Sequence, residues 1–128
     1  MEDAKKTLVL VVEDDVAFQG FLKEALELNG FAVLCANNGE EALDLLGVQK
    51  PDVILTDIVM PRKDGIELIR TLRTEAPEAR LIAMSGGGVL GHQDYYMELS
   101  RVMGVHGTLT KPFHMEQLLE LLKSVLAN

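Results

Sequence analysis

Five short apolar runs, each followed by a stretch with helical periodicity, constrain the fold of this chain more than any other feature of its sequence. The first run, Leu8–Val12, is an unbroken series of leucine and valine, which is typical of a strand buried on both faces of a parallel sheet. The other runs predict four further strands, at Phe31–Ala36, Val53–Thr56, Leu81–Met84 and Thr108–Thr110. The pattern therefore predicts a parallel β-sheet.

Apolar residues recur at helical spacing after each predicted strand. The predicted helices are Phe18–Leu26 with a stop at Gly30, a short helix from about Glu40, Ile66–Ala76 with a stop at Pro77, about His92–Met103, and Met115–Leu126. Right-handed crossovers between parallel strands place helices on both faces of the sheet. The sequence therefore predicts an α/β fold with five parallel strands and five helices.

Length and composition indicate one domain and exclude several classes of protein. A chain of 128 residues is the size of one domain, and its net charge of −8 disfavours direct binding to nucleic acid. No segment approaches the roughly 20 apolar residues of a membrane span, and Leu8–Val12 is too short for the core of a signal peptide. The single cysteine, Cys35, excludes an internal disulfide and suits a reducing compartment. We therefore expect a cytoplasmic protein with one domain over residues 1–128 and no effector domain.

Polar residues follow four of the predicted strands at their carboxyl ends. Glu13–Asp15 follow the first strand, Asp57 ends the third, Ser85 follows the fourth and Lys111 follows the fifth. Ligands of open parallel sheets bind outside the carboxyl ends of the strands, and neighbouring strands lie about 5 Å apart. We therefore expect these side chains to converge in one cleft.

Each of these residues has a structural interpretation beside a functional one. Close carboxylates repel one another, so Glu13–Asp15 could bind a hard divalent cation or simply cap the following helix. Asp57 could be a nucleophile that becomes an aspartyl phosphate, or it could form an Asx turn. Lys111 could pair with a carboxylate or phosphate, aimed inward by a cis bond to Pro112, and Ser85 could donate to a phosphoryl oxygen or only end its strand. Their placement at the ends of one sheet favours the functional interpretation.

The order and identity of these residues resemble those of a known family. Over essentially all of its length, the chain resembles the response-regulator receiver domains of two-component signalling, which share the CheY-like fold. The resemblance is carried by four segments, Leu8–Asp15, Asp57–Gly65, Ile82–Gly87 and Leu109–Phe113. It implies a flavodoxin-like, doubly wound sheet of five parallel strands in the order 2-1-3-4-5, with five helices.

The resemblance implies a phospho-acceptor signalling switch. Asp57 would receive a phosphoryl group from a sensor histidine kinase or a histidine phosphotransfer protein, Lys111 would pair with that group, and Ser85 would hold the Thr/Ser switch position. The electrostatics agree, because positioned cations stabilise the charge that develops on phosphoryl oxygens. The chain would catalyse only its own phosphoryl transfer and slow autodephosphorylation, and we therefore do not expect an enzyme.

The resemblance also implies a Mg²⁺ site. The acidic pair of the family maps to Glu13 and Asp14. Asp14, the Asp57 carboxylate and the backbone carbonyl of Val59 would hold Mg²⁺, with Glu13 acting mainly through water. Asp15 falls one position later and is interpreted as a helix cap. The cation would offset the charge of the clustered carboxylates.

One position departs from the family pattern. The family usually has Tyr or Phe three residues before the lysine, whereas this chain has Thr108. The rotating aromatic side chain that reports the switch is therefore missing, which leaves the route of signalling open. Receiver domains use the face formed by helix 4, strand 5 and helix 5 for partner binding or self-association. The apolar residues within Tyr95–Met103 either extend that face or pack on the sheet.

Other functions remain as alternatives. A phosphatase-like enzyme with Asp57 as its nucleophile would typically have a second aspartate two residues later, where this chain has Val59. A flavodoxin-like cofactor binder would need a phosphate-binding loop after the first strand, where Glu13–Asp15 would repel a phosphate. A pseudo-receiver that binds partners without phosphorylation is disfavoured by the complete set of site residues. We favour a stand-alone receiver over one excised from a larger transcriptional regulator or hybrid kinase.

Overall fold

The computed structural model describes residues 5–58, 65–86, 98, 101 and 103–127. The strands are β1 (Leu8–Val12), β2 (Ala32–Ala36), β3 (Val53–Asp57), β4 (Arg80–Ser85) and β5 (Gly107–Thr110), and the helices are α1 (Val16–Leu28), α2 (Gly39–Leu46), α3 (Gly65–Glu75) and α5 (Met115–Leu126). The predicted fourth helix, His92–Met103, lies almost entirely outside the described residues, although Glu98 and Arg101 have helical backbone. No helix in the described part of the chain is long and apolar enough to cross a membrane.

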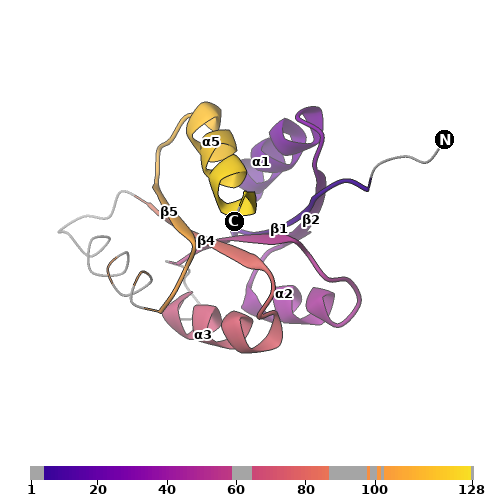
Figure 1. The fold of residues 1–128 in the computed structure, drawn as a ribbon, viewed down its shortest axis with the longest axis vertical. Coiled ribbons are helices and arrows are strands. Elements are labelled where there is room, and N and C mark those ends of the chain that lie inside the picture. Colours follow the sequence, from indigo (N-terminus) through magenta and orange to yellow (C-terminus); the bar gives the residue numbers. More distant parts are fainter. Residues whose placement is uncertain (1–4, 59–64, 87–97, 99–100, 102, 128) are drawn as a thin grey trace.

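The strands form one parallel sheet in the order β2-β1-β3-β4-β5, as predicted. The chain runs from β1 to β2 at one side, and then crosses back past β1 to β3. Figure 1 shows that α1 and α5 cover one face of the sheet and that α2 and α3 cover the other. The predicted doubly wound α/β fold is therefore confirmed, with the carboxyl ends of β1 and β3 side by side.

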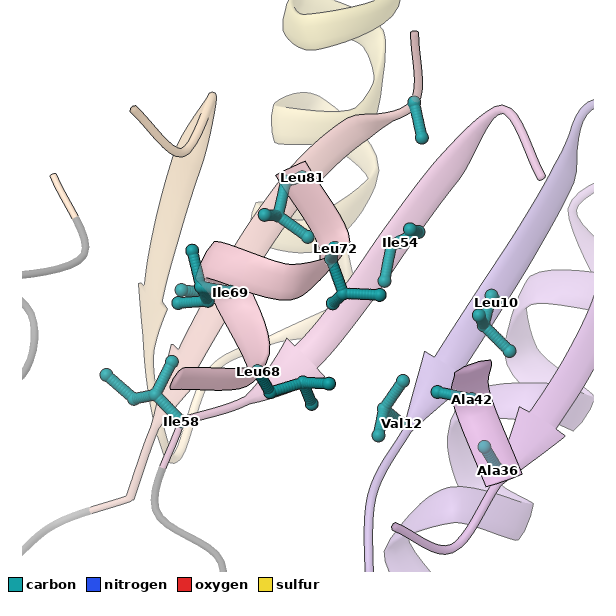
Figure 2. Packing of buried hydrophobic residues seen from close by; sticks show 12 residues of the cluster. Leu10, Val12, Ala36, Ala42, Ile54, Ile58, Leu68, Ile69, Leu72 and Leu81 are labelled. Atoms are coloured by element: carbon teal, nitrogen blue, oxygen red, sulfur yellow. The ribbon is translucent and has the colours of Figure 1, made fainter. Parts of the chain in front are cut away.

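Apolar side chains fill both spaces between the sheet and its helices. Alternate residues of a strand point to opposite faces, so Val9 and Val11 pack under α1 and α5, whereas Leu10 and Val12 pack under α2 and α3. Figure 2 shows Leu10 and its neighbours in the second of these clusters. Complete burial of one such leucine contributes about 1.5–3 kcal/mol to stability. Packing on both faces of the sheet therefore fixes the positions of the strand ends.

Some element boundaries differ from the predicted ones. The prediction started β2 at Phe31, but the Phe31 N–H donates to the carbonyl of Leu26 and closes the end of α1, so β2 starts at Ala32. Gly30, with φ +91°, makes this turn. The prediction started β4 at Leu81, but the Arg80 N–H donates to a carbonyl before β3, which extends β4 by one residue.

Candidate functional site

The carboxyl edge of the sheet brings together acidic and basic residues that are far apart in the sequence. Glu13 directly follows β1, Asp57 ends β3 and Lys111 directly follows β5. Backbone hydrogen bonds continue past the strands, because the Glu13 N–H donates to Ala36 O at 3.0 Å and the Lys111 N–H donates to Ser85 O at 2.7 Å. The sheet itself therefore sets the direction in which these residues leave it.

Three carboxylates form a cluster at this edge. Glu13, Asp14 and Asp57 each place one oxygen within 4.8 Å of the others. Glu13 and Asp57 are 1% and 5% exposed, whereas Asp14 is open to solvent. Such a set of hard oxygen donors, with one open side, fits a divalent cation such as Mg²⁺. The fourth predicted ligand, the backbone carbonyl of Val59, lies outside the described residues.

Lys111 joins two of these carboxylates. Its Nζ donates to Glu13 Oε1 at 2.7 Å and to Asp57 Oδ2 at 3.1 Å. Burial disfavours the charged ammonium, but the bonds and negative charges of Glu13 and Asp57 outweigh that effect and raise the pKa of Lys111. The bond from Lys111 to Pro112 is cis. The expected pairing of Lys111 with a carboxylate is present.

Both oxygens of Glu13 have partners in the protein. Oε1 accepts from Lys111, and Oε2 accepts from the Asp15 N–H at 3.1 Å. Burial raises the pKa of the Glu13 carboxyl, while the bond to Lys111 acts in the opposite direction. The Asp15 side chain accepts from the Phe18 N–H and caps α1, so its interpretation as a helix cap is confirmed. Glu13 is thus the counter-ion of Lys111, and Asp14 is the most open of the three carboxylates.

The charges at this edge do not balance. Among the residues that the structure describes, three carboxylates face one ammonium. Even at an effective dielectric constant of 20, a pair of like charges 4 Å apart repels by about 4 kcal/mol. A bound cation removes this repulsion, whereas an added phosphate without a cation would increase it. The arrangement therefore suits a cation that accompanies a phosphoryl group.

Ser85 lies at the same edge and is completely buried. It follows Met84, which pairs with Asp57 in the register of β3 and β4, and its carbonyl accepts from the Lys111 N–H. Its hydroxyl lies 3.4 Å from the carbonyl of Gly86. The predicted switch residue is thus connected to Lys111 through the backbone.

Two residues of α1 also contact the site, and the sequence analysis did not identify them. The Gln19 side-chain amide donates to the carbonyl of Glu13 at 2.9 Å and to that of Ala36 at 3.2 Å, so it ties the end of β1 to the end of β2. The Phe18 ring lies 4.6 Å from the Lys111 Nζ. The sequence analysis uses Phe18 only as the first apolar residue of the predicted helix, although its position in the first turn after Glu13–Asp15 was a usable signal.

Known proteins share this sequence pattern. A family model described as the response regulator receiver domain matches residues 9–123. Response regulator MprA of Mycolicibacterium vanbaalenii is 33% identical over 118 residues, which cover 92% of this chain and 49% of that protein. MprA of Mycobacterium avium is 32% identical, with coverage of 92% and 50%. The chain therefore spans about half the length of these curated relatives.

Solved structures share the fold. A response regulator from Thermotoga maritima is 28% identical with a TM-score of 0.83, over 97% of this chain and 100% of that chain. A CheY-like receiver domain protein from Methanospirillum hungatei is 27% identical with a TM-score of 0.86, over 96% and 95%. TrrA from Thermotoga maritima, solved in complex with Mg²⁺-BeF, is 29% identical with a TM-score of 0.79, over 94% and 99%. From its sequence match, its strand order and its acidic strand ends, this chain belongs to the response regulator receiver domain family.

Proposed function

We propose that this chain is a phospho-acceptor signalling switch in which Asp57 receives a phosphoryl group from a histidine kinase or a histidine phosphotransfer protein. The contact of Lys111 with both Glu13 and Asp57, beside the open carboxylate of Asp14, is the observation that supports it most. A carboxylate held next to an ammonium, at an edge that attracts a cation, suits attack on a phosphorus atom.

Asp14 and Asp57, with Glu13 beside them, would hold Mg²⁺. The bound ion supplies positive charge to the oxygens of the phosphoryl group. The Mg²⁺-BeF complex of the similar TrrA supports this choice of metal. The geometry of the protein residues is already set by the sheet, so the ion would meet a preformed group of donors.

Asp57, Lys111 and Ser85 then have separate roles in the transfer of the phosphoryl group. An Asp57 carboxylate oxygen forms the new bond to phosphorus as the bond to the donor breaks. The Lys111 ammonium exchanges its contact with Asp57 for one with a phosphoryl oxygen and keeps its contact with Glu13. The Ser85 hydroxyl turns from Gly86 toward the new acceptor oxygens, which biases its loop between two states.

The output surface in this proposal is the face of β5, α5 and the predicted helix His92–Met103, and it acts through partner binding or self-association. A groove between β5 and α5 is lined by Thr108, Leu109, Gln117 and Leu121, among others. In place of the usual aromatic side chain, Thr108 accepts a 3.5 Å hydrogen bond from the Arg101 guanidinium. We expect sedimentation that depends on concentration and changes when beryllofluoride is added. Identical monomers in both states would contradict self-association.

Phosphorylation can be tested directly. The protein is incubated with acetyl phosphate and Mg²⁺, and its intact mass is measured. We expect a gain of one phosphate in the wild type, no gain in Asp57→Asn, and an unchanged gain in Asp52→Asn, an aspartate at the other edge of the sheet. Chelation of Mg²⁺ should also abolish the gain. A wild type that never gains phosphate would instead favour a pseudo-receiver that binds partners without phosphorylation.

The chain would carry out only its own phosphoryl transfer and slow loss of the phosphate. A colorimetric assay of phosphate release from a small phosphomonoester measures any further turnover. We expect none above the background of Asp57→Asn. Repeated turnover that depends on Asp57 would instead indicate a phosphatase-like enzyme.

A further inference from the structure

In the part of the chain that the structure describes, the Lys111 ammonium contacts two carboxylates and one aromatic ring. Its Nζ donates to Glu13 Oε1 and Asp57 Oδ2, and it lies 4.6 Å from the centre of the Phe18 ring. An ammonium has three N–H groups. Two of them serve the bonds to the carboxylates, and the aromatic ring lies against the same ammonium. A cation over a ring is attracted by the negative face of the π-system, and more strongly where water is partly excluded. The Lys111 side chain is only 20% exposed, so this contact is partly shielded from water.

Phe18 is held by its backbone and by neighbouring rings. Its backbone N–H donates to the Asp15 cap, which fixes Phe18 in the first turn of α1. The Phe113 ring meets it edge-on, with ring centres 5.9 Å apart and planes at 71°. Phe113 follows Lys111 by two residues and leads into α5, which covers the same face of the sheet as α1 (Figure 1). The ring is thus held by the segments before α1 and before α5, which also carry Glu13 and Lys111.

We propose that Phe18 is a positioning residue for phosphoryl transfer, because its ring holds the Lys111 ammonium at the acidic cluster while the acceptor oxygens change. This inference rests on the proposed function. During transfer, Lys111 must exchange its contact with Asp57 for a contact with a phosphoryl oxygen. The ring does not take part in that exchange, so it holds the ammonium most strongly in the transition state, when the contact with Asp57 has broken and the contact with the phosphoryl oxygen is incomplete. An aliphatic side chain of similar size would fill the space without attracting the cation.

Two substitutions at position 18 and one control test the proposal. Phe18→Leu removes the ring and keeps most of the volume, Phe18→Tyr keeps the ring, and Phe21→Leu alters a 51% exposed neighbour whose ring stacks on Phe18. The rate of mass gain is measured at saturating acetyl phosphate and Mg²⁺. We expect Phe18→Leu to be slower by about 5- to 10-fold, as the loss of one partly buried cation–π contact implies. Phe18→Tyr should stay within about twofold of the wild type, and Phe21→Leu should be unchanged.

Two further measurements separate positioning from a general structural role. The Mg²⁺ concentration at half-saturation, from calorimetry, should be the same in all four proteins, because the Phe18 ring acts on the lysine, which is not a ligand of the metal. The NMR signals of the Lys111 ε-protons should be shifted upfield by the ring in the wild type and in Phe18→Tyr. In Phe18→Leu they should return to the position of an ordinary lysine, with other amide signals in place.

The proposal is overturned if Phe18→Leu gains phosphate as fast as the wild type, or if Phe18→Tyr is as slow as Phe18→Leu. A parallel loss of Mg²⁺ binding in Phe18→Leu would also overturn it, because that result indicates a distorted site. If the wild type itself gains no phosphate, the proposed function fails and the role in transfer fails with it. The NMR signals then show separately whether the ring contacts the ammonium.

Discussion

Polar and charged side chains at the amino edge of the sheet bind backbone groups. Asp52 accepts from the Leu8 N–H at 2.8 Å, Arg80 donates to a carbonyl of α5 at 3.1 Å, and His106 accepts from the Leu81 N–H at 3.0 Å. At the carboxyl edge, Glu13 and Asp57 both bind the Lys111 ammonium, although Glu13 also accepts from a backbone N–H. A side chain that binds the backbone stabilises the fold. A cluster with more negative than positive charges retains electrostatic repulsion, which a bound cation can offset.

The surface is also hollowed at the amino edge, away from the acidic cluster. A groove of 430 Å³ lies at the amino edge, lined by side chains of both signs, including Lys50, Asp52, Glu75 and Arg80. Its charges are mixed, and two of these side chains bind the backbone as described above. Among the described residues, the imbalance of charge, rather than the presence of a hollow, therefore distinguishes the candidate site.

Loss of Lys111 should have the largest effect on stability. In Lys111→Met, Glu13 stays 1% exposed without its counter-ion, and we expect a loss of about 2–3 kcal/mol in the free energy of unfolding by urea at pH 7. The loss should shrink at lower pH, because protonation of Glu13 removes the unpaired charge. Lys123→Met, at an exposed position in the last turn of α5, is the matched control. Equal losses in both variants would contradict the contrast between the edges.

Mg²⁺ should act at the carboxyl edge alone. At 100 times its dissociation constant, a ligand of the folded state stabilises it by about 2.7 kcal/mol. We expect such a gain in the wild type and a much smaller one in Asp14→Asn, measured by thermal unfolding. Without Mg²⁺, Asp14→Asn should be more stable than the wild type by about 1 kcal/mol, because it relieves repulsion. Asp15→Asn keeps a good cap and should respond to Mg²⁺ like the wild type; failure to do so would place a ligand at Asp15.

Removal of a backbone contact at the amino edge should have a smaller effect. Asp52→Ala deletes the acceptor for the Leu8 N–H, and we expect a loss of about 0.5–1 kcal/mol in urea unfolding. Asp52→Asn keeps an acceptor oxygen and should recover most of it. Neither variant should change Mg²⁺ binding or the mass gain with acetyl phosphate. A change in either would mean that the two edges are coupled.

The smallest effect should be a dependence on pH at His106. Partial burial, together with the positive charges of Arg73 and Arg80, lowers the pKa of His106 in the folded protein. The unfolded chain therefore binds a proton more readily, and stability falls as the pH decreases through the ordinary histidine pKa of about 6.5. His106→Gln keeps a side-chain acceptor and should show less decline between pH 7.5 and about 5.5. Identical pH profiles in urea unfolding would exclude this role for His106.

The strands and the acidic edge could be predicted because their signals are local. An apolar run such as Val53–Thr56 identifies a buried strand by itself, and the residue that follows it must lie at the carboxyl edge. The bond between Lys111 and Glu13 joins residues 98 positions apart, and only the strand order brings them together. The role of Gln19 depends on two backbone carbonyls and that of His106 on one backbone N–H, and the sequence has no periodic signal for such contacts.

The three consecutive acidic residues after β1 have three different directions. Glu13 turns inward to the lysine, Asp14 faces solvent, and Asp15 turns back into the helix that it begins. Each of the three positions therefore has its own role, and the roles cannot be exchanged. Deleting one of them would change the total charge of the chain by a single unit. It would also move the remaining acidic residues out of the positions that pair with the lysine, face solvent and cap the helix. A homologue with an equally acidic loop of different length is for that reason no substitute for this one.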